Sequence, residues 1–447
     1  MRDNGYPLER LFGRILTPFE QFLRRTTSGG IILMGTTAVT LVLANSKWGG
    51  SLRSFWNQPI YFGVGSQQLV LSPHLLVNDG LMTLFFLLVG LELKREILVG
   101  ELSAMRDAAL PVIAALGGMI FPALIYYSLN SDVLAVRGWG IPMATDIAFA
   151  VGILVLLAWR VPRNLIIFLT ALAIADDLGA VAIIALFYTN DISLPALGCA
   201  AGMIAFLLLL NRGGIRHPVP YVVGGVLLWF SMLQSGIHAT IAGVLLACAI
   251  PARPSVTSVA FEQRLSQLQG LFHTEPPTRN TLSNPRMATI AQCLEDTART
   301  VQSPLQRMEH TLNPWVAFLV VPIFAFSNAG IDFSEIRLGE GLKHPVALGI
   351  ILGLVVGKFL GISVFSWLAV KLRIGKLPAG VGWRHLLGVA WLGGIGFTMS
   401  LFISQLAFPD PLIREYAKLG ILFASAISAI IGLVWLYIAS NVSTNPR

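Results

Sequence analysis

Long apolar stretches, separated by short polar ones, dominate the chain. About twelve of them can be delimited, and several reach the roughly 20 residues that an α-helix needs to cross the hydrocarbon core of a bilayer. This pattern predicts an all-α polytopic membrane protein with about twelve transmembrane helices. The segments run approximately over residues 29–46, 78–93, 108–129, 138–157, 165–187, 194–210, 219–233, 237–250, 314–330, 345–370, 386–407 and 419–439.

Composition excludes an ordinary soluble domain. Of the 447 residues, 55% are hydrophobic and 12% are charged, whereas about a quarter of the residues of soluble proteins are charged. The net charge of +8 is explained by topology, so we expect no nucleic-acid partner. With the N-terminus inside, the inner stretches hold 23 Lys and Arg residues and the outer ones hold 7. The positive-inside rule therefore predicts that both termini are cytoplasmic.

The polar stretches divide the chain further. Residues 1–28 predict an amphipathic helix on the inner membrane surface rather than a cleavable signal peptide. Residues 59–71 predict a small extracytoplasmic β-hairpin. Residues 251–313 predict a partly disordered cytoplasmic loop, whose later part forms an amphipathic helix. One face of that helix would carry Ile290, Leu294, Val301 and Leu305. Membrane segments then fill 29–250 and 314–440, followed by a cytoplasmic tail, 441–447.

Two adjacent aspartates, Asp176 and Asp177, lie in the middle of the apolar segment 165–187. A charge near the bilayer centre is costly and persists only beside a wet cavity or a partner. Neighbouring helix residues point about 100° apart, so we expect one side chain to face a cavity and the other a neighbouring helix. Repulsion within the pair predicts coupled titration. Protons and sodium or lithium could compete for these oxygens, which indicates a cation-coupled transporter. The alternative is a structural pair held by salt bridges.

Two segments carry signals of a broken helix. In the fourth segment, Pro142 precedes Thr145 and Asp146, which favour helix caps over helix interiors. Asp146 would neutralise the new helix N-terminus, and Thr145 could offer oxygen to an ion. In the eleventh, Gly393, Gly394 and Gly396 weaken a helix, although small residues also serve close packing in membranes. Paired interruptions are typical of transporter sites, which favours two discontinuous helices over a polar kink.

A lone buried lysine and an outer aspartate complete the polar residues of the segments. Lys358 lies mid-segment, where it could pair with Asp176 or offset the negative ends of broken helices; snorkelling to the interface is the alternative. Asp79 begins the second segment, where a helix cap and a place on the ion path are both open.

Charged residues gather at the inner end of the second segment and before the ninth. They are Glu92, Lys94, Arg95, Glu96, Glu309 and His310. A solvated charged rim is the simpler interpretation, because interfaces collect such residues. The sharper hypothesis is a pH-sensing cluster at the cytoplasmic funnel, because histidine titrates near neutrality.

Several motifs together resemble the NhaA-type sodium/proton antiporters, over nearly the whole chain from Gly29 onwards. The motifs are Asn78–Met82 (NDGLM), Phe85–Glu96 (FFLLVGLELKRE), Ala144–Ala150 (ATDIAFA), Ala173–Ala180 (AIADDLGA), Ser235–Thr240 (SGIHAT), Phe324–Gly330 (FAFSNAG) and Gly394–Ser400 (GIGFTMS).

This resemblance implies twelve helices with inverted-topology repeats, in which the fourth and eleventh are unwound and cross in mid-membrane. It implies that Asp177 is the main ligand of sodium or lithium, that Asp176 partners Lys358, and that Thr145 and Asp146 stabilise the crossing. It further implies electrogenic exchange for pH and sodium homeostasis, activation at alkaline pH, a homodimer formed through the hairpin, and a bacterial inner membrane. Membrane lipids would be the other partners.

Three features depart from some members of the family: Asn313 stands where they have histidine, Phe359 follows the buried lysine in place of proline, and the loop 251–313 is long.

The alternatives to an antiporter are an intramembrane aspartate-dependent enzyme, another cation transporter and a passive channel. An adjacent Asp pair lacks the two-element geometry of aspartyl proteases, and we find no nucleotide-binding pattern. We therefore expect no cofactor. The cysteines Cys199, Cys248 and Cys293 indicate neither a disulfide framework nor a zinc site.

Overall fold

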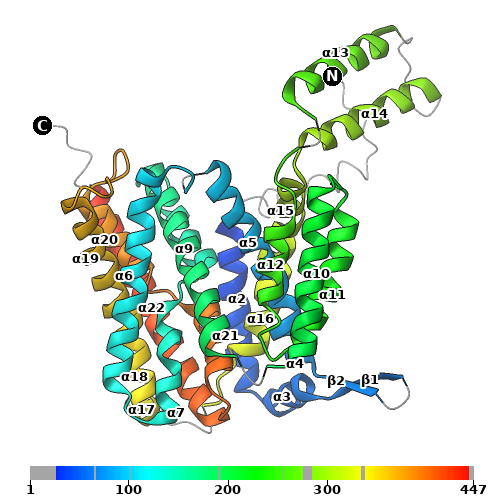
Figure 1. The fold of residues 1–447 in the computed structure, drawn as a ribbon. Coiled ribbons are helices and arrows are strands. Elements are labelled where there is room, and N and C mark those ends of the chain that lie inside the picture. Colours follow the sequence, from blue (N-terminus) through cyan, green and yellow to red (C-terminus); the bar gives the residue numbers. More distant parts are fainter. Residues whose placement is uncertain are drawn as a thin grey trace, which may run out of the picture.

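In the computed structural model, the chain forms a bundle of long helices with a small two-stranded sheet at one end (Figure 1). The structure describes residues 27–64, 67–100, 102–189, 192–254, 256–274, 284–333 and 338–441. The amphipathic helix predicted within residues 1–28 lies almost wholly outside the described residues.

The first part of the chain contains the two strands and the first broken helix. Its elements are α2 (Thr27–Ala44), α3 (Gly49–Asn57), β1 (Ile60–Val64), β2 (Gln67–Leu71), α4 (Pro73–Leu75), the π-helical turn η1 (Leu76–Leu81), α5 (Met82–Val99), α6 (Met105–Leu129), α7 (Val133–Val136), the 3₁₀ helix η2 (Arg137–Met143), α8 (Ile147–Leu156), α9 (Arg163–Phe187), α10 (Leu194–Arg212), α11 (Pro218–Leu233) and α12 (Ile241–Ala249).

The second part adds a projection at one end and the second broken helix. Its elements are α13 (Ser258–Thr274), α14 (Pro285–Val301), α15 (Pro304–Trp315), the π-helical turn η4 (Val316–Val320), α16 (Val321–Asn328), α17 (Leu338–Gly341), α18 (Pro345–Leu352), the π-helical turn η5 (Gly353–Gly357), α19 (Lys358–Lys371), α20 (Trp383–Leu392), α21 (Phe397–Ala407) and α22 (Pro411–Asn441).

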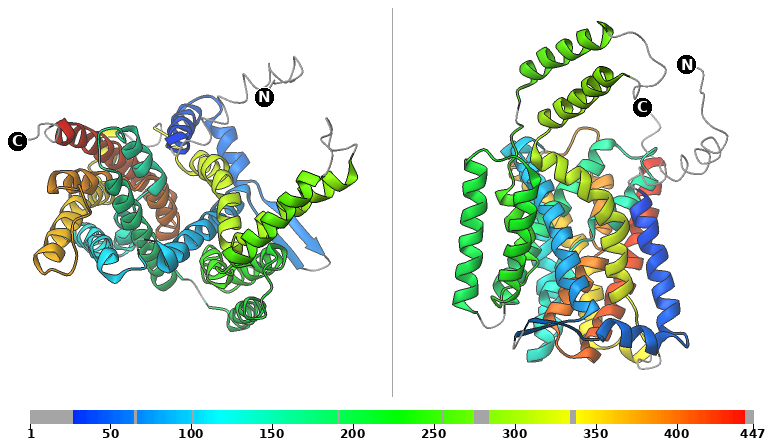
Figure 2. Two further views of the ribbon diagram at one scale, coloured as in Figure 1. Left: turned by 90° about the horizontal axis from the view of Figure 1, so that it is seen from above. Right: turned by 90° about the vertical axis from the view of Figure 1, so that its right-hand side faces the viewer.

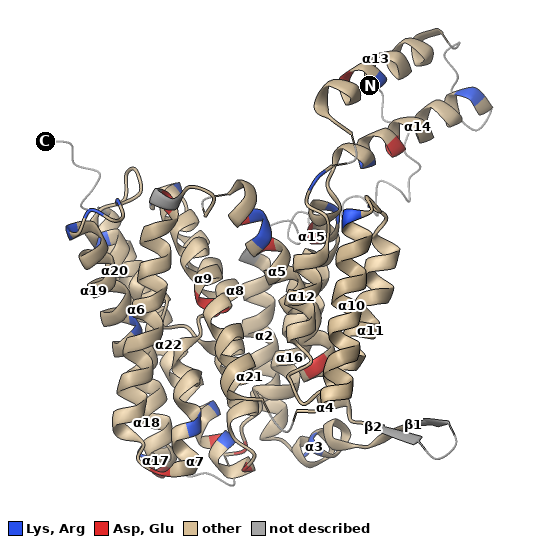
Figure 3. Ribbon diagram, in the orientation of Figure 1, with Lys and Arg blue, Asp and Glu red and all other residues tan. Residues whose placement is uncertain are grey.

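The described helices confirm a multi-pass, mainly helical membrane protein. Eight are long and apolar enough to cross a membrane, or up to ten if each of two bent pairs counts as one span. Every apolar segment delimited in the sequence contains a helix, but α11 has 16 residues and α12 has 9. Both are shorter than the roughly 20 residues of a usual span. Charged residues gather at the two ends of the bundle, and few lie in its middle (Figure 3).

The two ends of the bundle differ. At one end, α13 and α14 project beyond the other helices; at the other end lie α3 and the two strands (Figures 1 and 2). We call these the projection face and the strand face. β1 and β2 pair antiparallel, with Ile60 opposite Leu71.

The stretch 251–313 holds more helix than the predicted loop. α14 covers Ile290 and Leu294, where an amphipathic helix was expected. That helix does not continue to Leu305, because a new one begins after Ser303. The Ser303 side chain accepts a hydrogen bond from Gln306 N, and Gln306 caps Ser303 in return. This capping box starts α15 in a new direction.

Glycines bring α6 and α19 into close contact. A methyl group on Gly361 would clash with the Gly117 carbonyl oxygen, and one on Gly117 would clash with that of Gly361. Small residues of this kind let membrane helices approach closely. The contact lies one turn beyond Lys358, so it holds the lysine-bearing part of α19 against α6. Phe359 stacks on Trp391 with ring centroids 4.2 Å apart, which joins α19 to α20.

Replacing Gly361 with alanine should push α6 and α19 apart. We expect a loss of about 1–3 kcal/mol in the free energy of unfolding, because extra volume in a packed core forces strain. A thermal melt of the detergent-solubilised protein measures it. Gly202→Ala in α10 is the matched control, since nothing lies within 4 Å of its added methyl group. Equal melting of the Gly361→Ala variant and the wild type would contradict tight packing at this contact.

Candidate functional site

Two helices are interrupted in the middle of the bundle, and the interruptions touch. Residues 144–146 are extended between η2 and α8, and residues 393–396 separate α20 from α21, which is bent from it by 44°. Asp146 N donates to Ile395 O at 2.7 Å, and Thr145 Oγ1 donates to Gly393 O at 2.9 Å. Each break thus supplies partners for backbone groups that the other leaves open.

The glycines of the second break weaken the helix, and they also allow neighbouring segments to approach closely. A methyl group on Gly394 would lie 2.5 Å from both Leu354 O and Ser428 Oγ. One on Gly396 would lie 3.0 Å from Ala144 O and clash with Ser400 Oγ. A larger residue at position 394 would push the second break away from η5 and α22, and one at position 396 would push it away from the first break. The sequence left a broken helix and small-residue packing as alternatives, and both descriptions hold.

Asp146 caps two helices at once. Its Oδ1 accepts from Phe149 N at 3.0 Å, at the start of α8. Its Oδ2 accepts from Thr398 N at 3.0 Å and from Thr398 Oγ1 at 2.5 Å, at the start of α21. A carboxylate is therefore placed against the positive ends of both helix dipoles. Sequence reasoning gave Asp146 this capping role for α8 but missed Thr398, which lies on the second break.

Lys358 pairs with Asp176 in the centre of the bundle. Its Nζ lies 2.5 Å from Asp176 Oδ2 and donates to Thr145 Oγ1 at 2.9 Å. Thr145 Oγ1 in turn donates a hydrogen bond to the carbonyl oxygen of Gly393, at the C-terminal end of α20. Lys358 is 0% exposed, so it does not snorkel to the interface. Of the sequence alternatives, the structure has the salt bridge with Asp176, together with an indirect link to a negative helix end.

Asp177 differs from the other two aspartates. It is 0% exposed, and neither of its carboxylate oxygens has a hydrogen-bond partner among the described residues. Asp176 contacts a neighbouring helix through Lys358, as expected of one member of the pair. Asp177 has unpartnered oxygens, but it is fully buried and does not line the cavity that was expected for the other member. Three buried carboxylates face one lysine here, and this surplus of negative charge favours a bound cation or proton.

No ready-made cage of three ligands surrounds a cation in the part of the chain that the structure describes. No three His, Cys, Asp or Glu side chains there converge on one point. A cation at Asp177 would therefore have to complete its shell from Asp176, from backbone oxygens or from water, which suits a site that must release its ion.

A cavity opens on the projection face, beside the first turns of α9. It is a cavity of about 550 Å³ between α5, α6 and α9, with Glu96, Asp107 and Thr170 in its wall. Thr170 precedes Asp177 by seven residues on α9. Since seven residues make almost two full helical turns, both side chains lie on one face, about 10 Å apart along the axis. The cavity therefore approaches the aspartate from this side.

The charged residues beside this opening form one linked group around Arg95. Its Nη1 lies 2.5 Å from Glu309 Oε1, and its Nη2 lies 2.9 Å from Glu96 Oε1. Glu309 is 7% exposed and Glu92 is half-buried, which a freely solvated rim does not explain. His310, in contrast, is exposed. Asn313, one of the departures from the family pattern, is exposed as well.

Two further placements correct or extend the sequence predictions. Asp79 does not cap its helix: Ser72 does, by accepting from Leu75 N at 3.1 Å, and Asp79 lies within η1 of the continuing helix. Lys94 donates to the carbonyls of Cys248 at 2.7 Å and Ile250 at 2.5 Å. It thereby caps the C-terminal end of the short α12. No sequence signal pointed to that contact.

Comparison with known proteins places this geometry in context. A family model described as Na+/H+ antiporter 1 matches residues 20–436. The Na+/H+ antiporter NhaA of Syntrophobacter fumaroxidans is 67% identical over 451 residues, with 100% of this chain and 96% of that protein covered. The NhaA of Acidithiobacillus ferrooxidans is 57% identical, with 96% and 98% covered. A solved sodium proton antiporter from Methanocaldococcus jannaschii has a TM-score of 0.46 at 16% identity, over 97% and 95% of the chains.

Removing the Lys358 side chain should strip Asp176 of its partner. We expect Lys358→Ala to lower the free energy of unfolding by about 3–5 kcal/mol, because an uncompensated charge then stays buried. The double variant Lys358→Ala/Asp176→Asn should regain most of this loss. Thermal melts in detergent measure both, and Lys371→Ala at the exposed end of α19 is the control. Unchanged melting of the single variant would argue against a stabilising ion pair.

Proposed function

The chain belongs to the Na+/H+ antiporter 1 family, and from this premise we propose how its buried aspartates exchange sodium for protons. The protein is a sodium/proton antiporter, as its relatives at 57–67% identity are. That identity leaves no support for the intramembrane enzyme considered from the sequence.

The proposed mechanism rests on the environment of the Asp177 carboxylate. Its two oxygens are buried without a hydrogen-bond partner among the described residues, beside the Lys358–Asp176 pair. A carboxylate in this state binds either a proton or an alkali cation, because each neutralises its charge. It cannot bind both at the same oxygens. Competition between the two at Asp177 is sufficient for antiport through one site.

The number of carboxylates suggests electrogenic exchange. Asp177 can hold one proton and the Asp176–Lys358 pair can hold a second, whereas one sodium or lithium ion would take the place of both. A cycle that swaps the two loads moves more protons inward than cations outward. Lys358 supports this cycle, since it can hold Asp176 when the cation is absent. Asp146 takes a structural role, because its oxygens are already committed to α8 and α21.

We propose twelve crossings with inverted-topology repeats, α8 and α21 being halves of the two discontinuous helices. The start of α2 and the end of α22 both lie at the projection face (Figures 1 and 2), which supports an even number of crossings. The distribution of Lys and Arg supports a cytoplasmic projection face in a bacterial inner membrane. The cavity near Thr170 would then admit cytoplasmic sodium.

Two accessory roles complete the proposal. The group of Glu92, Arg95, Glu96, Glu309 and His310 would sense cytoplasmic pH, since three acids and an exposed histidine surround one arginine at the inner mouth. The β1–β2 strands would join two copies into a homodimer. Asp79 would lie on the ion path at the strand face.

We expect Asp177→Asn to abolish exchange, because an amide neither binds a proton reversibly nor balances a cation. Everted membrane vesicles, acidified by respiration and followed with a pH-sensitive dye, provide the measurement. Wild-type vesicles should release protons on addition of sodium or lithium but not potassium.

The matched control is Asp132→Asn, the same change at an exposed position, which should transport like wild type. Wild-type rates in the Asp177→Asn variant would disprove the shared-site mechanism. Recovery with potassium would contradict the selectivity.

A further inference from the structure

Lys358 directly follows a π-helical turn. That turn, η5, covers Gly353–Gly357, and α19 begins with the lysine itself. A π-helical turn holds about one residue more than an α-helical turn, and each residue of a helix changes the direction of the side chain by about 100°. The direction of Lys358 therefore differs from the one that a continuous α-helix would give it. It depends on contacts that hold the turn and the residues after it.

Two glycines fit the turn against its neighbours. A methyl group on Gly353 would lie 2.7 Å from Pro142 Cβ, and one on Gly357 would lie 2.8 Å from Pro122 Cα. Pro142 belongs to η2, just before the first break, and Pro122 lies within α6. Because a glycine has no side chain that opposes rotation about the helix axis, these contacts set the position of the turn. The direction of the lysine that follows needs a further contact.

The side chain next to the lysine supplies this contact through an aromatic stack. The rings of Phe359 and Trp391 are nearly parallel, with an angle of 18° between their planes and 4.2 Å between their centroids. Trp391 Nε1 is buried and has no hydrogen-bond partner among the described residues. Buried indoles usually find a partner for this group, and leaving it without one is costly. The ring face on Phe359, and not a hydrogen bond, therefore explains the position of Trp391.

The stack and the polar contacts of the lysine form one closed loop. Lys358 Nζ donates to Thr145 Oγ1 at 2.9 Å, and Thr145 Oγ1 donates to Gly393 O at 2.9 Å. Gly393 follows Trp391 by two residues. Trp391 stacks on Phe359, the neighbour of Lys358 in the chain. Since neighbouring side chains of a helix point about 100° apart, a fixed Phe359 ring also fixes the direction of the lysine.

We propose that the Phe359–Trp391 stack positions Lys358 for exchange. It fixes the direction of the lysine after the π-helical turn and thereby holds the ammonium group at Asp176 and Thr145. Both aromatic residues act through the lysine and not on the ion. Proline, which some family members have at position 359, would constrain the backbone itself, whereas phenylalanine acts through its ring. This inference rests on the proposed antiport.

Loss of the stack should change the pH dependence of exchange. The ammonium group would then spend less time at Asp176, and a proton would compete better with sodium for the carboxylates. The other charged groups that act on this pair are Asp177, beside Asp176 on α9, and Asp146 of the first break. Both are carboxyl groups, and the loss of the stack leaves them in place. Exchange at a fixed sodium concentration would therefore need a more alkaline pH.

A stack that only fastens α19 to α20 makes a different prediction. Its loss would lower the melting temperature and leave the pH dependence unchanged.

The test follows the pH dependence of exchange in everted vesicles at one sodium concentration. The variants are Trp391→Leu, Phe359→Leu and the double variant. We expect each single change to move the pH of half-maximal exchange about one unit toward alkaline pH, the lower end of the effect of a neighbouring opposite charge. The double variant should show the same shift as either single one, because both remove one shared contact. Trp391→Phe keeps an aromatic face and should restore most of the wild-type behaviour.

The matched control is Phe365→Leu on the same helix. Phe365 is half-buried like Phe359, and it packs edge-on against Phe121 of α6 with centroids 6.1 Å apart. Its replacement removes an aromatic contact of α19 about two turns beyond the lysine. The control should therefore melt at a lower temperature in detergent but keep the wild-type pH dependence.

An unchanged pH of half-maximal exchange in both leucine variants, with folded protein shown by detergent melts, would overturn the proposal. An equal shift in Phe365→Leu, or shifts that add in the double variant, would do the same. If Trp391→Leu does not fold, Phe359→Leu decides the question alone, since it is the smaller change. A wild-type protein that exchanges no sodium for protons at any pH would instead refute the antiport, so the two failures are distinguishable.

Discussion

The structure depends on one constraint: backbone groups freed by two broken helices must find partners where no water replaces them. Each break supplies these partners for the other, through the backbone of Asp146 and the side chain of Thr145. Gly396 allows the two unwound segments to come into contact. Because each break supplies hydrogen-bond partners for the other, the fourth and eleventh segments stabilise one another's unwound stretches. The contacts of α6, α19 and α20 are arranged around that junction.

The charges of the site follow from the same junction. Unwinding exposes helix ends of both signs, and the chain matches three of the four with a side chain of opposite sign. Asp146 faces two helix N-termini, and Lys358 reaches a helix C-terminus through Thr145. Asp177, the other acid of the pair, caps no helix end, and its oxygens have no hydrogen-bond partner among the described residues. Its availability for a mobile cation is therefore a consequence of how the other charges are used.

The sequence predicted those features of the site that depend on residues of a single segment. Pro142 and the glycines mark the breaks, and the spacing of adjacent aspartates separates their directions. It could not find partners far along the chain: Thr398 is 252 residues from Asp146, and Asn328 is 250 from Asn78. Helical periodicity gives the face of a residue but not the helix opposite. One error was avoidable, because Ser303-Pro304 carries a readable helix-start signal that separates Leu305 from the helix of Ile290 and Leu294. Ser72-Pro73 carries the same signal and settles which residue caps the helix that contains Asp79.

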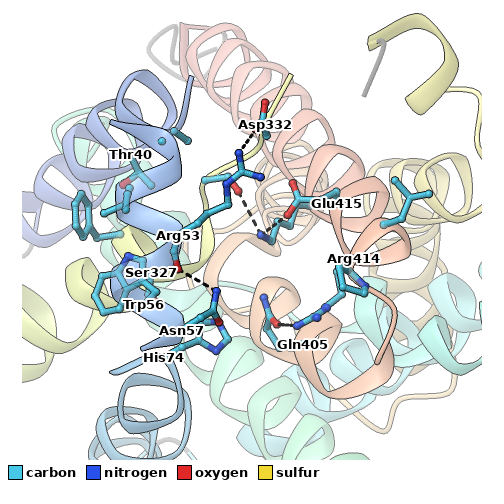
Figure 4. A pocket seen from close by; sticks show the side chains of 18 of the residues that line it. Thr40, Arg53, Trp56, Asn57, His74, Ser327, Asp332, Gln405, Arg414 and Glu415 are labelled. Atoms are coloured by element: carbon cyan, nitrogen blue, oxygen red, sulfur yellow. Dashed lines mark hydrogen bonds and ion pairs between the residues drawn. The ribbon is translucent and has the colours of Figure 1, made fainter. Parts of the chain in front are cut away.

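The two cavities also change the electrical thickness of the protein. Along α9, the inner cavity ends at Thr170, about 10 Å from Asp177, and along α21 a second cavity, at the strand face (Figure 4), begins at Gln405, about 10 Å from Thr398. Water in both would confine the membrane potential to roughly 20 Å instead of the roughly 30 Å of hydrocarbon. A charge that passes between them still crosses the whole voltage, about 2.3 kcal/mol per 100 mV. The field at the aspartates is thus about half as strong again as in the surrounding lipid, so small displacements there carry most of the electrical work.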